Sequence, residues 1–192
     1  MKKLIILLLV TVSTILFCSC SSNEASDTYF IHAMGFKKEN DEYTLFSVCE
    51  KFEKDNSEYF LINHRGKDIE GTLDKMRKEY KDCYFATIKY YFISSETDKS
   101  LISAMAKEIC DSNHLPSKNI ICMISGNSIE DFMGQIKNSD DTKKIQKALD
   151  GKSINTVNFF SHYTSGKNLK TTVLSQQEDG TLTAKETTIS PR

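Results

Sequence analysis

The sequence YFATIKYYFI, residues 84–93, is a run of apolar and aromatic residues that decides the fold. Aromatic and β-branched side chains favour strands, and a run without polar alternation is typical of a strand buried on both faces. We therefore predict a central strand over residues 84–93. The aromatic side chains of this run could also form a stacking platform, but the sheet core, with tyrosine hydroxyls at its edge, is the interpretation we adopt. They are Tyr84, Phe85, Tyr90, Tyr91 and Phe92.

Three strands are predicted ahead of this run. Residues 29–36 alternate bulky side chains on both faces, and residues 43–52 form a second strand after a short charged turn. Such a short polar connection predicts an antiparallel hairpin. Residues 59–64 form a third, shorter strand. Gly35, inside the first strand, indicates a turn or a close approach of another segment.

One helix is expected before the central strand in the sequence and one after it. Residues 68–80 place apolar side chains along one helical stripe. A second helix, capped by Asp98, runs through Cys110, and Pro116 prevents its continuation. Residues 119–124 then form another short buried strand.

Three further helices are predicted in the last third of the chain. Asn127 and Glu130 have the spacing of a capping box at the first helix. Asp140 or Asp141 opens the second, which Gly151 ends. A third short helix covers residues 155–163.

A hairpin is predicted at the end of the chain, because residues 170–176 and 181–189 flank an Asp179-Gly180 turn. The complete order is β-β-β-α-β-α-β-α-α-α-β-β. Hairpins at both ends with helices between them indicate an α+β fold with a mixed, largely antiparallel sheet and helices packed on it.

The N-terminus has the features of an export signal. Lys2 and Lys3 precede an apolar run over residues 4–16, which is shorter than the roughly 20 residues a membrane span needs. The run leads to Ser19 and Cys20, which resemble a bacterial lipobox, a small residue before a cysteine that is diacylated and becomes the new N-terminus. A plain leader and an uncleaved anchor are the two alternatives.

This interpretation divides the chain into a signal peptide over residues 1–19, a small, polar tether over residues 20–27, and one α+β domain over residues 28–192. Removal of Lys2 and Lys3 leaves 23 basic against 26 acidic residues, a net charge of about −3. That balance argues against a nucleic-acid partner. We expect the protein on the outer face of the cytoplasmic membrane, held there by two acyl chains on Cys20.

Four cysteines follow the lipidation site: Cys49, Cys83, Cys110 and Cys122. Their spacing fits no zinc site. We expect buried free thiols that behave as small hydrophobic side chains, although an oxidising exterior also permits one or two disulfides.

No catalytic motif is found. Gly151-Lys152-Ser153 resembles the end of a phosphate-binding loop, but Gln146 stands where the loop needs its first glycine. His64-Arg65-Gly66 lies between a strand and a helix, where it either closes a turn or holds a ligand. The sequence therefore predicts no catalytic residue, no cofactor and no metal ligand. The four histidines are scattered through the chain: His32, His64, His114 and His162.

Several segments, taken in order after the lipobox, resemble the N-terminal domain of the Ger(x)C family, the C-subunit lipoproteins of spore germinant receptors. They are Ala33-Met34-Gly35-Phe36, Tyr43-Thr44-Leu45, Gly66-Lys67-Asp68-Ile69-Glu70-Gly71 and Tyr84-Phe85-Ala86-Thr87-Ile88-Lys89. The chain departs from the family pattern at Lys37, Asp68, Gly71 and Thr87. The resemblance covers the mature chain and corresponds to the first of the family's three domains.

The resemblance implies a non-enzymatic protein of the spore inner membrane, with palmitate among the acyl chains on Cys20. Its partners would be the integral-membrane A and B subunits, in a receptor for nutrient-triggered germination. Two further functions stay open: an envelope solute-binding lipoprotein unrelated to spores, and an exported hydrolase.

Overall fold

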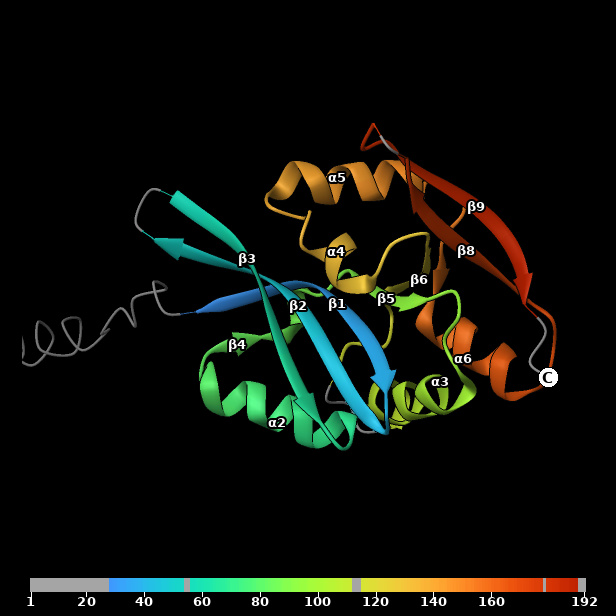
Figure 1. Ribbon diagram of the computed structural model, residues 1–192, viewed down its shortest axis with the longest axis horizontal. Helices are drawn as coiled ribbons and strands as arrows, with labels where there is room; N and C mark the ends of the chain where they lie inside the picture. The colour runs from blue at the N-terminus through green and yellow to red at the C-terminus, as the bar shows by residue number, and fades with distance from the viewer. Residues whose placement is uncertain (1–27, 54–55, 112–114, 178, 190–192) are drawn as a thin grey trace, which may run out of the picture.

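The computed structural model describes residues 28–53, 56–111, 115–177 and 179–189. These residues form one mixed sheet in the order β3-β2-β1-β5-β6-β8-β9, with helices on both faces (Figure 1). Two short strands extend it, β4 beside β1 and β7 beside β6. The predicted α+β class, with its mixed and largely antiparallel sheet, is confirmed.

The first three strands form an antiparallel meander at one edge of the sheet. They are β1 (Tyr29–Glu39), β2 (Glu42–Glu53) and β3 (Asn56–Gly66), and β3 is longer than the sequence predicted. Asn40 and Asp41 connect β1 to β2 with φ angles of 49° and 61°. A two-residue hairpin turn with both φ angles positive matches the right-handed twist of the strands, and Asn and Asp tolerate it best after glycine.

The centre of the sheet is parallel. β1 is followed by β5 (Tyr90–Ser94), β6 (Ile120–Ser125) and β8 (Leu169–Gln176), and each neighbouring pair runs parallel. β7 (Ile154–Asn155) pairs antiparallel with β6. β9 (Leu182–Ile189) pairs antiparallel with β8 at the far edge. The predicted Asp179-Gly180 hairpin is therefore confirmed, with Gly180 at a φ of 81°.

The prediction of one strand over residues 84–93 is wrong. The run divides into β4 (Cys83–Tyr84), a 3₁₀ turn η2 (Phe85–Thr87) and β5. β1 pairs with β4 at Phe30 and with β5 at Ala33. Five residues, 85–89, then lie opposite two on β1, and the turn takes up the excess. The Thr87 hydroxyl holds the turn in place by donating to the carbonyl of Ile31, at 2.9 Å.

The helices cover the two faces of the sheet in separate groups, below and above it in Figure 1. One group packs on the face that carries Ile31, Tyr91 and Ile121, and the other on the face that carries Phe46 and Phe92. The first group is α2 (Ile69–Glu79), α3 (Lys99–Ala106) with the π-helical turn η3 (Lys107–Asp111), and α6 (Thr156–Thr164). The second is α4 (Ile129–Met133) and α5 (Ser139–Ala148).

Helix starts were predicted with mixed success. Asp98 caps α3 as expected, with its carboxylate accepting from the backbone N–H of Leu101. The capping box at Asn127 is wrong, because the hydroxyl of Ser128 accepts from the N–H of Asp131 instead. Asn138 caps α5, so Asp140 and Asp141 fall inside its first turn, where negative charge favours the helix dipole.

Gly35 lies where another segment approaches the strand closely, which was one of the two interpretations of this glycine; the other was a turn. A Cβ atom at this position would lie closer than 3.0 Å to Met133 Sδ and to Ile129 Cγ2 of α4. The missing side chain therefore lets α4 rest directly on β1.

Candidate functional site

Cys20, the predicted lipidation site, lies outside the described residues, as do the signal peptide and the tether. The structure therefore bears on candidate residues within the described ranges alone. Candidate residues there come from the cysteines, the histidines, the exposed aromatic side chains and the cavities.

The four later cysteines are free thiols, which confirms that expectation. Cys49 and Cys122 are buried, whereas Cys110 is exposed at the end of η3, where burial was predicted. Burial raises the pKa of Cys122 to about 12 and that of Cys83 to about 11. Thiolates are the reactive form of cysteine, so these thiols are poor nucleophiles at neutral pH.

His64 has a structural contact rather than a place in a pocket. It lies within β3, and its Nε2 is 3.0 Å from a carboxylate oxygen of Glu79 in α2. Its ring also meets the edge of Tyr80. The side chain therefore joins β3 to the last turn of α2 through Nε2, while its Nδ1 is buried without a hydrogen-bond partner among the described residues.

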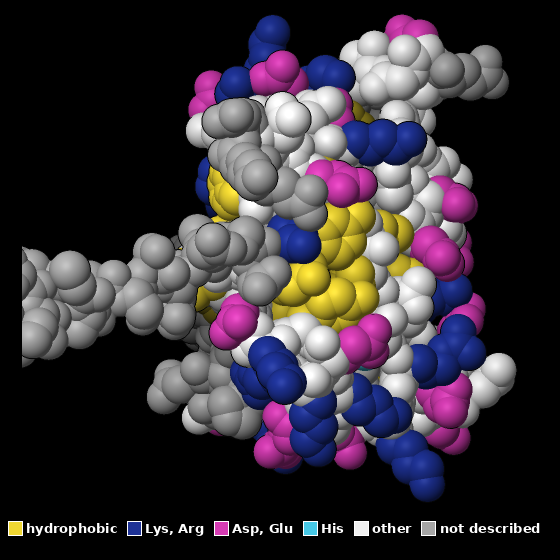
Figure 2. All heavy atoms as spheres, turned by 90° about the vertical axis from the view of Figure 1, so that its left-hand side faces the viewer, with side chains coloured by type: hydrophobic (Ala, Val, Ile, Leu, Met, Phe, Trp, Pro, Cys, Tyr) yellow, Lys and Arg dark blue, Asp and Glu magenta, His cyan; other side chains and the backbone are white. Residues whose placement is uncertain are grey.

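An aromatic patch, defined here as Phe30, Phe52 and Tyr84, lies at the end of the sheet where the described chain begins. Phe30 is at the start of β1, Phe52 near the end of β2, and Tyr84 in β4 directly opposite Phe30. The Phe30 ring centroid is 5.3 Å from that of Phe52 and 5.8 Å from that of Tyr84. Phe52 is 42% exposed and Tyr84 51%. Figure 2 looks at this end and shows hydrophobic side chains gathered on the surface with charged residues around them.

The position of α4 explains why the patch is open. The helix rests on β1 at Gly35 and packs with Phe46 of β2, and Phe30 lies five residues further toward the start of the strand. The two-residue strand β4 extends the sheet at this end without bringing a helix onto the same face. The aromatic side chains therefore meet each other at the surface.

A polar cluster of His32, Glu50 and Tyr59 lies next to the patch on the same face of the sheet. The Glu50 carboxylate is 2.7 Å from Nε2 of His32 and accepts from the Tyr59 hydroxyl at 3.1 Å. The His32 and Tyr59 rings are stacked, with centroids 5.3 Å apart. Glu50 is only 8% exposed. Burial, together with the Glu50 charge, raises the pKa of Tyr59 to about 12.

The sequence did not predict this cluster. Its three residues come from three strands and have no spacing signal of their own. The predicted β1–β2 hairpin supplied part of the signal, because its register places Glu50 opposite Phe30, and Tyr59 is in turn opposite Glu50. The bulge after Ile31 changes the register near His32, and no sequence pattern revealed it.

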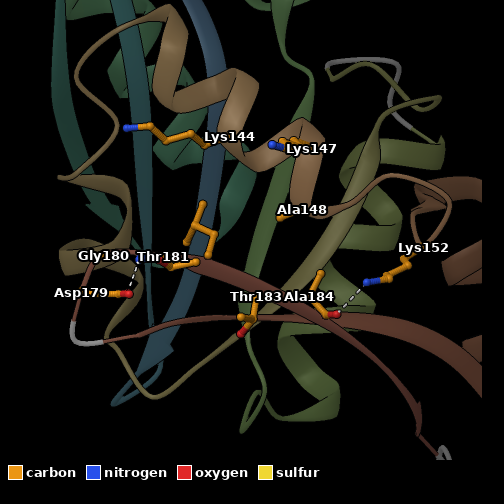
Figure 3. Close-up of a pocket in the computed structure, with 10 residues that line it drawn as sticks. Lys144, Lys147, Ala148, Lys152, Asp179, Gly180, Thr181, Thr183 and Ala184 are labelled. Atoms are coloured by element: carbon orange, nitrogen blue, oxygen red, sulfur yellow. Dashed lines mark hydrogen bonds between the residues drawn. The ribbon is translucent and has the colours of Figure 1, made fainter.

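A cavity of about 720 Å³ lies between α5 and the edge strand β9 (Figure 3). Lys144, Lys147 and Lys152 line it. Lys152 donates to the carbonyl of Ala184 at 3.2 Å, and Lys144 is paired with Asp141 at 2.9 Å. In Figure 3, the side chain of Lys152 extends toward Ala184, whereas that of Lys144 points away from Ala184. The lysine charge suits an anionic ligand better than a neutral one.

Within the described ranges, no helix is long and apolar enough to cross a membrane. The same part of the chain holds no group of three or more His, Cys, Asp or Glu side chains placed to bind a metal ion. Comparison with models of known protein families, with curated proteins and with solved structures found no match.

Proposed function

We propose that the protein is a membrane-anchored lipoprotein that acts by protein contact as a subunit or accessory component of a spore germinant receptor. The observation that carries the proposal is the order of segments: a lipobox ending in Cys20, followed by the strand and helix segments that resemble the Ger(x)C N-terminal domain. Its partners would be the multi-pass A and B subunits at the outer face of the spore inner membrane.

The positions of these segments in the fold support the proposal. Ala33 to Phe36 lies in β1 beneath α4, and Tyr43 to Leu45 begins β2. Gly66 ends β3, and Asp68 caps α2. Three of the four segments therefore belong to one continuous β-β-β-α unit, and the fourth, Tyr84 to Lys89, follows it through β4 and the turn η2.

The lipid has a simple physical role in this proposal. Two acyl chains hold a protein at a bilayer far longer than one does. A domain confined to the membrane surface meets integral-membrane partners at a high effective concentration, so weak contacts suffice for assembly. Cys20 is therefore the residue on which the proposed function depends most.

Deletion of the gene tests the proposal. Spores without the protein should respond poorly to nutrients and normally to triggers that bypass nutrient receptors. Wild-type protein should restore the response, and the Cys20→Ala variant should restore little of it. A normal nutrient response in the deletion strain would exclude the germinant-receptor role.

The cavity beside β9 favours a second candidate function, an envelope lipoprotein that binds an anionic solute. Its volume lies within the ~300–1,000 Å³ of small-molecule sites, and three lysines line it. A thermal-shift screen with acidic amino acids and sugar phosphates tests this candidate. Stabilisation that Lys147→Glu abolishes and Lys167→Glu retains would support it, because Lys167 does not line the cavity.

A further inference from the structure

We propose that the aromatic patch of Phe30, Phe52 and Tyr84 docks on the lipid bilayer, so that the open end of the sheet faces the membrane. The inference rests on the proposed lipid anchor at Cys20. It adds a second point of attachment within the folded domain, and thereby an orientation that the lipid alone does not provide.

The first argument is the reach of the chain. Nine residues, from Cys20 to Thr28, precede Tyr29. Fully extended they span at most about 30 Å, whatever conformation they adopt, because each residue adds no more than ~3.3–3.6 Å. A folded domain of this length has a radius of gyration of roughly 15 Å, and so a diameter near 40 Å. The start of β1 is thus kept close to the bilayer, and Phe30 is its second residue.

The second argument is the chemistry of the side chains. Tyrosine concentrates at membrane interfaces, where its ring enters the apolar region and its hydroxyl stays among the headgroups, and phenylalanine is common on the apolar face of interfacial segments. Tyr84, the most exposed of the three, carries such a hydroxyl.

The third argument is size. A large aromatic side chain buries roughly 150–250 Å² when fully covered. At the observed exposures, with Phe30 half-buried, the patch offers roughly 250 Å² of aromatic surface. A stable protein interface needs roughly 800 Å² from each partner. The patch is therefore smaller than a stable interface with a soluble partner or a second copy, whereas binding to a lipid surface increases with each apolar side chain that is buried.

The docked orientation has a consequence for the rest of the molecule. The start of β1 and the β8–β9 hairpin lie at opposite ends of the view in Figure 1. With the patch on the bilayer, the C-terminal hairpin is turned away from the lipid, where it is accessible to soluble domains of a partner or to solutes.

Tryptophan fluorescence tests the proposal, because the chain contains no tryptophan. Phe52→Trp places a single reporter in the patch, and Tyr84→Trp gives an independent second position. Val157→Trp is the matched control, because Val157 is 46% exposed and belongs to α6. Each lipidated variant is reconstituted into vesicles of phosphatidylcholine and phosphatidylglycerol, with or without bromine on the acyl chains, and circular dichroism confirms that it folds.

We expect the emission of Phe52→Trp and Tyr84→Trp to shift to the blue and to be quenched by brominated lipid at least threefold more than that of Val157→Trp. Equal quenching at all three positions would overturn the proposal. A blue shift without bromine quenching would also overturn it, because protein, either a second copy or another segment of this chain, would then cover the patch.

Vesicle flotation of the same samples separates this inference from the proposed anchor. If the lipidated protein floats and the patch reporters are not quenched, the docking proposal fails and the anchor stands. If the protein does not float, the anchor itself fails, and the docking proposal falls with it.

Discussion

Gly35→Ala is the substitution whose effect follows most directly from the packing. The added Cβ would meet Met133 Sδ and Ile129 Cγ2 closer than 3.0 Å. Carbon and sulfur atoms of a packed core normally approach no closer than about 3.5 Å. Both neighbours are buried, so α4 must move away from the sheet or two core side chains must leave their rotamers.

The net destabilisation should be about 2 kcal/mol. Overpacking of a core costs about 1–3 kcal/mol, and two simultaneous clashes place this site at the upper end of that range. Alanine recovers up to about 1 kcal/mol, because it restricts the unfolded chain more than glycine does. For a domain of this size, such a loss lowers the melting temperature by roughly 4–8 °C.

Urea unfolding, followed by far-ultraviolet circular dichroism, measures this change through the midpoint at constant slope. A double-mutant cycle with Met133→Ala supplies the control, because truncation of Met133 makes room for the new Cβ. The cost of Gly35→Ala should then fall by about half. If Gly35→Ala is as stable as the parent, or its cost is unchanged beside Met133→Ala, α4 does not rest on β1 as described.

Three further predictions concern single side chains. In the native protein a thiol reagent should label Cys110 rapidly and Cys122 only on unfolding, because burial shields Cys122 and raises its pKa to about 12; equal labelling rates would contradict this. Tyr59 has a raised folded pKa near 12, so its contribution to stability is complete below pH 10 and lost toward pH 12; Tyr59→Phe should therefore lose less stability than the parent over that interval, as measured by urea unfolding at each pH. Asp98→Ala should cost about 1 kcal/mol in urea unfolding at pH 7 by removing the α3 cap. Hydrogen bonds from the Leu101 N–H and the Ser100 hydroxyl lower the Asp98 pKa, so this contribution is present above about pH 4 and lost as the pH falls through the lowered value; Asp98→Asn, which keeps the cap without a charge, should show no such dependence.

The sequence predicted most elements because their signals are local. The stripe of Ile69, Leu73 and Met76 identified α2, and all three side chains are buried. The Asp179-Gly180 turn identified the final hairpin. The strand over residues 84–93 was wrong for a non-local reason, because β1 pairs with Tyr84 and Tyr90 at positions only three residues apart, Phe30 and Ala33. A run of aromatic residues contains no information about its pairing with another strand.

The aromatic patch could not be predicted from the sequence. Phe30, Phe52 and Tyr84 were each expected within strands, but nothing in their spacing showed that they share a face. That arrangement requires the register of β1 with β2 and β4. The aromatic cluster of residues 84–93 was assigned to the sheet core, which holds for Tyr91 and Phe92 but not for Tyr84.

The N-terminus of the mature protein decides the central claim. Intact mass spectrometry of the protein extracted from spore membranes should give residues 20–192 with a diacylglycerol thioether on Cys20 and an acyl chain such as palmitate. A mature chain that begins at another residue, or that carries Cys20 as a free thiol, would contradict the anchor and with it the proposed place of this domain at the membrane surface.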